Sequence, residues 1–423
     1  MPTPAPRYQR PARQQMQIDE RSLDQTLTPD HIARVVWDFV AGLDLSPLHA
    51  QVKAVEGSPG HPPIDPRILL ALWLLATLDG IGSARELERL CAEHAAYLWV
   101  RGGVGVNYHT LSDFRSDNGE LFDRLLTQSV ASLLHAGLAE LAEVAQDGMR
   151  VRASAGSSSF RRRQTLQDCL KVAENRVAEL RTATEGGVTT GQRAARERAA
   201  RERLERVQQA LAAQQELAGQ QAATAEKSGR KPREPRASTT DPEARRMKMA
   251  DGGTRPAYNV ELATTTASGL IVGVDVINAG TDHGQLGPMV DQVEKRFGKR
   301  PRRVLADGGF AQLDDIDTLH GSRVAVYAPV KEPKAKDRDP HVPKRGDKPG
   351  VAAWRVRMGT AEAKSIYRQR GPTAEWVNAR FRNWGLRQFV VRGLEKVGSV
   401  ARLFALAHNL MRGFVLRAQA ATG

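Results

Sequence analysis

The chain has 423 residues, enough for two or three domains, and a formal net charge of +14 at pH 7. This positive excess favours a polyanionic partner, nucleic acid before an anionic membrane surface. The longest largely apolar run, residues 68–78, is too short to cross a bilayer, and the two cysteines suggest no disulfide framework, so a cytoplasmic protein is predicted.

The first part of the chain is predicted to be helical. Residues 1–22 read as a flexible polar arm, and residues 23–138 follow with helical spacing of apolar residues. Thr28-Pro29 and Asp65-Pro66 each place a capping residue before a proline, which is typical of a helix start. One helix is predicted over residues 86–95. Several short helices in a basic protein are compatible with a helix-turn-helix-like reader of DNA and with a plain helical bundle.

An α/β domain is predicted to begin with a strand within residues 139–159. This strand reaches an acidic end at Asp147, and Arg150 and Arg152 then alternate with apolar residues. A carboxylate at the end of a strand is well placed to hold a cation or a polar substrate.

Residues 160–250 have a different composition and are predicted to be an insertion. Leu, Val and Ala recur at three- and four-residue spacing, which predicts a helical hairpin of coiled-coil type with a break near residues 185–187. The Lys-, Arg- and Pro-rich residues 227–246 predict a flexible basic loop.

Residues 251–415 are predicted to complete the α/β domain, and residues 416–423 to form a tail. Strands and helices alternate here, in the order expected of a layered domain with a mixed sheet. The predicted elements are strands at 258–263 and 269–276, a helix at 282–297, a strand ending at Asp307, a helix at 312–319, a strand at 323–330 and helices from 360 onward.

Strand-end carboxylates at Asp147 and Asp307 can lie side by side if their strands are neighbours. A third acid from a later helix would complete the group, and Glu375, in the first turns of a helix, is preferred to Glu362 and Glu395. Clustered carboxylates repel one another unless hard cations lie between them, so two Mg²⁺ ions are predicted, as used in phosphoryl transfer.

Two further acids are weaker candidates for the same site. Asp282 is interpreted as a helix N-terminal residue beside the helix dipole, and Asp275 lies in the middle of a predicted strand. A role for either one in the site stays open.

Several motifs resemble those of DDE-type transposases of bacterial insertion sequences. The most specific is the family's Tyr–Arg–Glu–Lys signature, matched by Tyr367, Arg370 and Glu375, with Arg382 at the Lys position. This match favours Glu375 over its rivals. Other similar stretches include Pro63-Ile64-Asp65-Pro66, His109-Thr110-Leu111-Ser112-Asp113-Phe114-Arg115, Asp147-Gly148-Met149-Arg150-Val151, Tyr258-Asn259-Val260-Glu261, where Gln is more usual at the last position, and Ala306-Asp307-Gly308-Gly309-Phe310, where Tyr is more usual.

The resemblance implies a ribonuclease H-like core flanked by helices, after a helical N-terminal domain over residues 23–138 that binds DNA ends. Asp147, Asp307 and Glu375 would bind two Mg²⁺ ions, which Mn²⁺ could replace. Contacts to double-stranded DNA, both terminal inverted repeats and target, are expected from a homodimer associated with the nucleoid. The DNA-contacting residues expected are Tyr367, Arg370, Arg382, Arg150 and Arg152.

The predicted reaction is hydrolysis of the phosphodiester bond at the end of the insertion sequence, the mobile DNA element. The freed 3′-hydroxyl then attacks target DNA. Two alternatives stay open. One is a transposase-derived protein that binds DNA without catalysis, and the other is a ribonuclease H-like nuclease that never joins strands.

Overall fold

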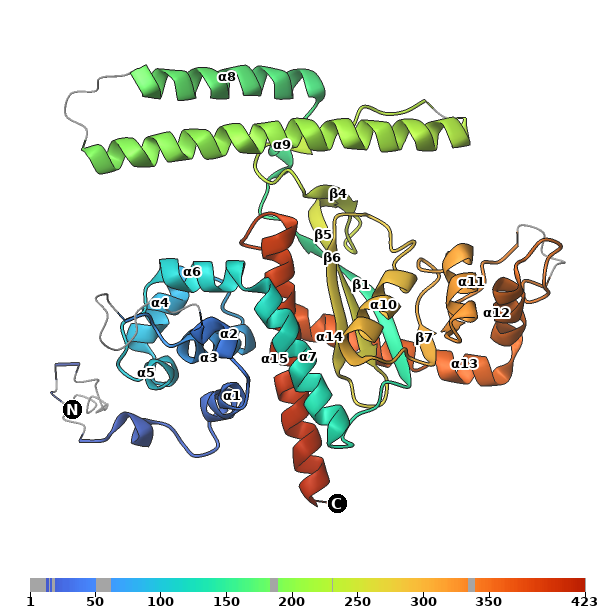
Figure 1. Ribbon diagram of the computed structural model, residues 1–423, viewed down its shortest axis with the longest axis horizontal. Helices are drawn as coiled ribbons and strands as arrows, with labels where there is room; N and C mark the ends of the chain where they lie inside the picture. Colours follow the sequence, from blue (N-terminus) through green and yellow to red (C-terminus); the bar gives the residue numbers. More distant parts are fainter. Residues whose placement is uncertain are drawn as a thin grey trace, which may run out of the picture.

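The computed structural model describes residues 13–14, 16, 20–50, 62–182, 189–229, 231–333 and 339–422. It consists of a group of N-terminal helices, a mixed sheet with helices on both faces, and a helical hairpin that lies across one side of both (Figure 1). Most of the arm predicted over residues 1–22 lies outside the described residues. Within those ranges, no helix is both long and apolar enough to cross a membrane.

The N-terminal helices pack around α3, which is buried on nearly every side. Its run of apolar residues from Ile68 to Ala76 leaves no polar face, so the other helices surround it. The helix predicted over 86–95 is confirmed as α4, which lies two residues earlier because the extended backbone of His94 ends it and caps α5. The elements are η1 (Leu23–Thr26), α1 (Ile32–Ala41), α2 (Ser46–His49), α3 (Pro66–Leu78), α4 (Ala84–Glu93), α5 (Ala95–Arg101), α6 (Tyr108–Asp117) and α7 (Gly119–His135).

The main sheet confirms the prediction of a mixed α/β domain. Its strands run in the order β4-β5-β1-β7-β8, and β6 also pairs with β5. The strand β1 is antiparallel to β5 and parallel to β7, which is parallel to β8. This order is compatible with a ribonuclease H-like core. The strands are β1 (Glu143–Arg152), β4 (Arg245–Lys248), β5 (Thr254–Thr265), β6 (Ile271–Ile277), β7 (Arg303–Leu305) and β8 (Ala325–Tyr327).

The pairing of β1 with β7 places the two predicted aspartates level with each other. The last paired residues are Ala145 and Leu305, and continuing this parallel register two residues further brings Asp147 opposite Asp307. The sequence suggested that Asp147 lies at the end of a strand. In the structure it does not, because β1 continues along β5 as far as Arg152. It lies instead where β1 loses its neighbour β7.

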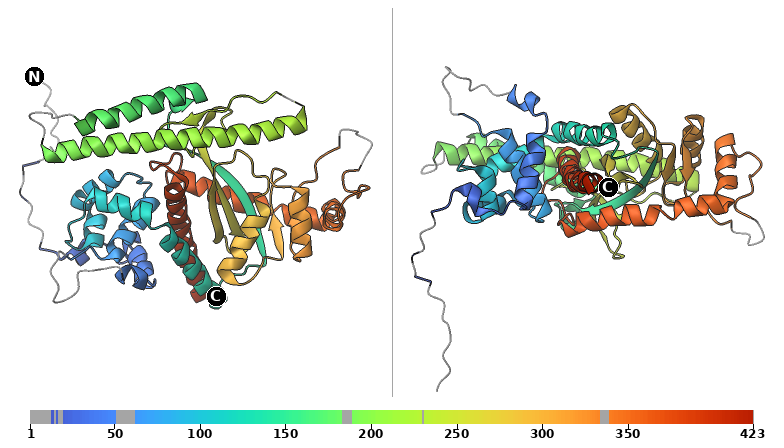
Figure 2. Two further views of the ribbon diagram at one scale, coloured as in Figure 1. Left: turned by 45° about the horizontal axis from the view of Figure 1, so that its top comes forward. Right: turned by 90° about the horizontal axis from the view of Figure 1, so that it is seen from below.

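Helices cover both faces of this sheet. One face packs on α10 (Leu286–Phe297), α11 (Leu313–Gly321), α12 (Pro349–Gly359) and α13 (Ala361–Tyr367), and the other on α14 (Arg370–Asn383) and α15 (Leu394–Thr422). The helix α15 contributes Phe404 to the sheet's core and Leu403 to the core of the N-terminal helices. Figure 2 shows it end-on between the two bodies. It continues past residue 415, where a tail was predicted to begin.

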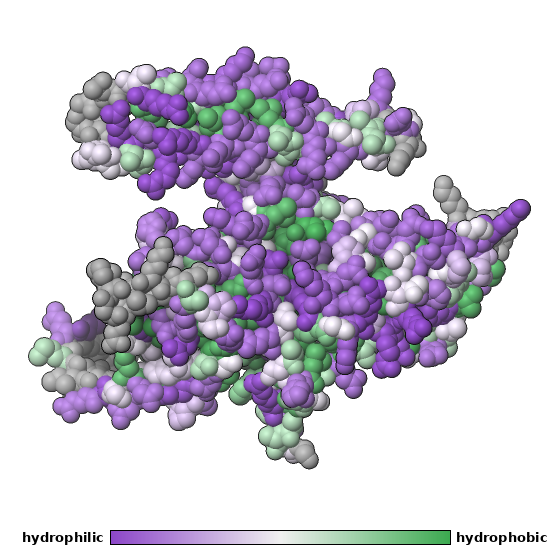
Figure 3. All heavy atoms as spheres, in the orientation of Figure 1, coloured by the Kyte–Doolittle hydropathy of each residue, from purple (hydrophilic) through white to green (hydrophobic). Residues whose placement is uncertain are grey.

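The predicted insertion contains a helical hairpin in the structure. Its two long helices pack along each other, and a short strand pair, β2 with β3, joins their base to the sheet domain. The surface of the hairpin is largely hydrophilic (Figure 3). The break predicted near residues 185–187 lies outside the described residues, and the segment 227–246, predicted to be a loop, contains β3 and the start of β4 because both pair with neighbouring strands. The elements are η2 (Ser157–Ser159), β2 (Phe160–Arg161), α8 (Arg163–Thr182), α9 (Thr190–Ser228) and β3 (Ala237–Ser238).

Candidate active site

Asp147 and Asp307 meet at a single guanidinium. Arg370 Nη2 lies 2.7 Å from Asp147 Oδ1 and 3.7 Å from Asp307 Oδ2. The side chain of Asp147 is 17% exposed and that of Asp307 is 42% exposed, so the pair lies at the surface edge of the core. Burial raises the pKa of Asp147 above its usual value, and the Arg370 charge opposes that rise.

The helix α14 carries the groups that contact Asp147. Arg370 is at its first turn, and Asn378, two turns later on the same side, donates to Asp147 Oδ2 at 2.8 Å. Both oxygens of Asp147 therefore accept hydrogen bonds from α14, which holds the carboxylate in one orientation.

Asp307 is shaped by the turn that follows β7. Its Oδ1 accepts a hydrogen bond from the backbone N–H of Gly309 at 2.7 Å. A Cβ at Gly309 would lie 2.9 Å from the same oxygen, so a side chain there would displace the carboxylate. The next residue, Phe310, is fully buried and anchors the turn to the core.

Glu375 does not join the two aspartates by a direct contact. It is exposed on α14, and its Oε1 lies 3.8 Å from the position that a Cβ on Gly371 would occupy. It is three residues before Asn378 on α14, about 60° around the helix axis from that residue. In the parts of the chain that the structure describes, no three His, Cys, Asp or Glu side chains are arranged to hold a metal ion. The rivals Glu362 and Glu395 are also exposed.

Asp282 lies closer to the aspartates than sequence reasoning suggested. It does not begin a helix, because α10 starts at Leu286; instead its Oδ1 accepts a hydrogen bond from Asn259 Nδ2 at 2.6 Å. Asn259 also donates to Glu261 Oε1 at 2.7 Å, and both residues are fully buried in β5. The signal in the sequence was two polar residues, Asn259 and Glu261, at alternate positions of a strand and next to the apolar Val260 and Leu262.

Asp275, the other weak candidate, accepts a hydrogen bond from the N–H of Val276 at 2.8 Å. It lies in β6 opposite Glu261, two strands away from β1. The strand order thus separates it from Asp147.

The predicted DNA-contacting residues have different surroundings. Tyr367 is half-buried near the aspartates, and burial raises the pKa of its hydroxyl. Arg382 and Arg152 are exposed. The guanidinium of Arg150 donates to the carbonyl oxygens of Lys248 and Gly280, at 3.2 Å and 3.1 Å, so it joins β4 to the segment before Asp282.

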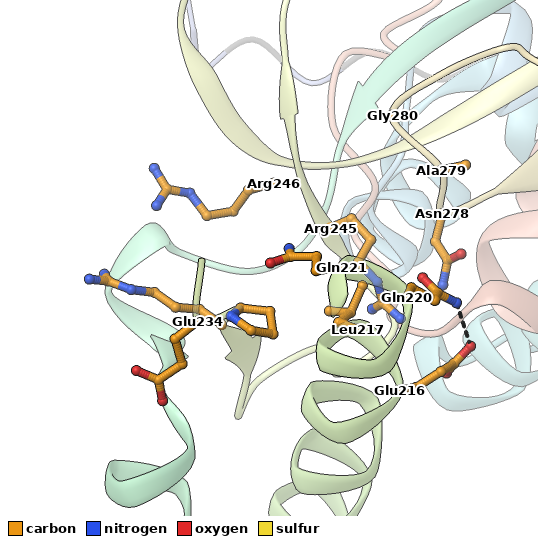
Figure 4. A pocket seen from close by; sticks show the side chains of 12 residues that line it. Glu216, Leu217, Gln220, Gln221, Glu234, Arg245, Arg246, Asn278, Ala279 and Gly280 are labelled. Atoms are coloured by element: carbon orange, nitrogen blue, oxygen red, sulfur yellow. Dashed lines mark hydrogen bonds between the residues drawn. The ribbon is translucent and has the colours of Figure 1, made fainter. Parts of the chain in front are cut away.

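A polar groove lies between the hairpin and the sheet domain. It has a volume of about 590 Å³ and is bounded by the last turns of α9, by the start of β4 and by residues 278–280 (Figure 4). Arg236 and Arg246 line it and are exposed; neither guanidinium has an ion pair among the described residues. Glu234, which also lines it, lies 3.6 Å from Arg162 and is partly neutralised.

Comparison with known proteins gives two matches in chain order. Residues 21–117 match the model of a transposase domain (DUF772), and residues 224–410 match the model of the transposase DDE domain. The second match contains Asp307 and Glu375, whereas Asp147 precedes it. Searches of curated proteins and of solved structures found no match. Transposase domains act on DNA, which agrees with the positive charge of the chain. The chain belongs to the DDE-type transposases of insertion sequences.

Proposed function

We propose that this transposase has a ribonuclease H-like core that cuts DNA at the terminal inverted repeats of its element and joins the freed 3′-end to target DNA. The observation that carries the proposal is the meeting of Asp147 and Asp307 at Arg370. These two acids come from neighbouring parallel strands, and the third, Glu375, follows Arg370 by less than two turns of α14.

The residues around the pair fit hard divalent cations. Every side chain that would bind the ion offers oxygen, the donor that Mg²⁺ and Mn²⁺ accept. Gly309 leaves the space beside Asp307 free of a side chain, and the buried Asn259 Oδ1 lacks a hydrogen-bond partner within the described residues. Asp147, Asp307 and Glu375 would hold two Mg²⁺ ions, which would activate the attacking oxygen and stabilise the leaving one.

Arg370 has two roles in this proposal. Without DNA it partly neutralises Asp147 and Asp307, which would otherwise repel each other. With DNA bound, its guanidinium turns to a phosphate beside the scissile bond, because a fork of N–H donors matches phosphate oxygens. Tyr367, half-buried nearby, would support the same strand. Protein dimers on the two ends would bring both active sites to one target.

The groove beside the hairpin would bind the DNA backbone that leads away from the cut. Residues 278–280 line it, and Asp282, two residues later, reaches the aspartate pair. One short segment therefore links the groove to the site of chemistry. Arg236 and Arg246 are the cations that would neutralise phosphates there.

The catalytic assignment is tested by cleavage of duplexes that carry the inverted repeats flanking the gene. We expect Asp147→Asn, Asp307→Asn and Glu375→Gln each to lower the cleavage rate by about 10³-fold or more, while DNA binding is retained. Glu362→Gln, at an exposed position of α13, is the matched control and should cleave like the wild type.

Three results would overturn the proposal. Retained cleavage in any of the three variants removes that residue from the catalytic set. Specific binding of the ends by the wild type without cutting indicates a DNA-binding protein without catalysis. Nicking without any joined product indicates a nuclease that performs no strand transfer.

The groove is tested by the salt dependence of DNA binding. If Arg236 and Arg246 each neutralise one phosphate, the Arg236→Ala/Arg246→Ala double variant should reduce the slope of log K against log salt by about 2. Arg198→Ala/Arg203→Ala, on an exposed part of α9 before the groove, is the matched control. Equal slopes in the two double variants would exclude the groove as a specific contact.

A further inference from the structure

Asp282 lies between the two segments that carry the catalytic aspartates. A Cβ at Gly148, the residue after Asp147, would lie 2.7 Å from Asp282 Oδ1. A Cβ at Gly309, two residues after Asp307, would lie 3.5 Å from Asp282 Oδ2. The two oxygens of this one carboxylate therefore face β1 on one side and the turn after β7 on the other, and the approach to β1 needs the glycine at position 148.

Two buried side chains of β5 hold Asp282 in this place. Asn259 uses its amide group to donate to Asp282 Oδ1 at 2.6 Å and to Glu261 Oε1 at 2.7 Å. Asn259 and Glu261 are 0% and 1% exposed. Buried polar groups are costly unless they are hydrogen-bonded, and these hydrogen bonds hold Asp282 beside the segments that carry the aspartate pair.

The network has more acceptors than donors. Asn259 Oδ1 and Glu261 Oε2 are buried and find no hydrogen-bond partner within the described residues, and Asn259 Oδ1 lies 3.0 Å from the Cβ position of Gly148. Buried acceptors are normally satisfied, so these two oxygens favour a positive charge in their neighbourhood. A side chain at Gly148 would collide with Asp282 Oδ1 and crowd Asn259 Oδ1.

The charges indicate the same need for a cation. The Asp282 carboxylate adds a third negative charge near those of Asp147 and Asp307, and Arg370 is the cation that contacts the first pair. With Arg370 in contact with both aspartates, the three acids are not themselves arranged as a metal site in the described residues. Three negative charges against one positive charge leave an excess that a divalent ion would balance.

We propose that Asp282 is a further metal-ligating carboxylate of the centre that contains Asp147 and Asp307. This inference rests on the proposed function and extends it. Asn259 and Glu261 are positioning residues, since they hold Asp282 without reaching the reacting atoms. Carboxylate oxygens are the ligands that Mg²⁺ and Mn²⁺ take in such sites.

A purely structural role for Asp282, as an anchor of its loop, makes a different prediction. Asp282→Asn keeps an oxygen for Asn259 to donate to but removes the negative charge. If Asp282 is only an anchor, this variant should bind metal like the wild type. If it is a ligand, metal affinity should fall, and the metal-free protein should become more thermally stable because one of three like charges is gone.

The test is calorimetric titration of the full chain with Mn²⁺, with and without bound end-containing duplex, together with melting curves. We expect Asp282→Asn to weaken Mn²⁺ binding by about tenfold or more. Asp275→Asn, in β6 opposite Glu261, is the matched control and should bind Mn²⁺ as the wild type does. Gly148→Ala, which leaves every charge in place but crowds Asp282 Oδ1, should also weaken binding and covers the case in which Asp282→Asn does not fold.

The outcomes separate this inference from the proposed function. If Asp147→Asn and Asp307→Asn lose Mn²⁺ binding while Asp282→Asn and Gly148→Ala bind like the wild type, the role of Asp282 is overturned and the proposed centre stands. If the wild type binds no Mn²⁺ in either state, or Asp147→Asn and Asp307→Asn bind it unchanged, both the centre and the inference are overturned.

Discussion

The sheet domain and the hairpin use their helices in two different ways. The sheet's helices bury a broad apolar face on each side of the strands, and α15 also serves the core of the N-terminal helices. The hairpin, in contrast, has a small cluster of Leu166, Ala210, Ala213 and Ala237, with hydrophilic surface around it. Catalytic groups need the rigid support of a broad buried core, as under the sheet. A surface that only contacts the DNA backbone can be supported by a small cluster such as that of the hairpin.

This difference predicts that damage to the sheet's core affects the whole protein. Phe310→Ala removes a fully buried ring directly after the Asp307 turn. We expect the free energy of unfolding to fall by about 3–5 kcal/mol, because a large cavity forms where the core cannot collapse. Chemical denaturation followed by tryptophan fluorescence measures it. A loss below about 1 kcal/mol would show that the turn is not anchored by this ring.

A cavity of similar kind in the hairpin should destabilise the hairpin without destabilising the sheet domain. Leu166→Ala empties a site that is 0% exposed within the small hairpin cluster. We expect a local loss of about 2 kcal/mol, at the low end for such changes, since few atoms surround the site. Limited proteolysis should become faster within residues 163–228, while the main melting transition keeps its midpoint. A shift of the main transition as large as that of Phe310→Ala would contradict the contrast between the two regions.

The junction of sheet and helices should also make the protein sensitive to acid. His408 is fully buried on α15, with Nε2 2.8 Å from Gly269 O and the rings of Trp376 and Phe381 beside it. Burial lowers the pKa of His408 to about 3, so between pH 6.5 and pH 3 the unfolded chain binds a proton that the folded one excludes. Stability from this group is present above pH 6.5 and is lost as the pH falls.

The free energy of unfolding should fall by about 1.4 kcal/mol per pH unit over the range in which His408 is protonated only in the unfolded state. His408→Gln keeps a polar side chain but removes the titration. We therefore expect denaturation midpoints of wild type and variant to converge as the pH falls from 6.5 toward 4. Parallel curves over this range would mean that His408 is not responsible.

How much of the site could be read from the sequence differs from residue to residue. The pairing of Asp147 with Asp307 was expected only if their strands are neighbours, and the parallel pairing of β1 with β7 meets that condition. The position of Arg370 against Asp147 did not follow, since a motif shows which residues share a helix but not which side chain fills the space before DNA arrives. Glu375 remains a prediction from the motif.

Asp282 shows where sequence reasoning fails. It precedes an apolar helical pattern, and by local rules it reads as a helix cap. Its actual partner, Asn259, lies in a different strand, so the competition between a local and a distant hydrogen bond was decided by tertiary structure. The same holds for residues 227–246, whose basic composition concealed two short strands that form only because β2 and β5 lie alongside.

Removal of the whole helical hairpin should have the smallest effect on the stability of the sheet domain. The strands β2 and β3 end in the pair Arg161 and Ala237, so residues 162–236 can be replaced by Asn-Gly, which closes a two-residue β-hairpin. If the hairpin adds little to the sheet's core, the main melting midpoint should stay within about 4 °C of the wild type. The groove would lose its α9 wall and Arg236, so the salt dependence of DNA binding should weaken. An unfolded product would show instead that the insertion is part of the core, and the contrast between the two regions would have to be abandoned.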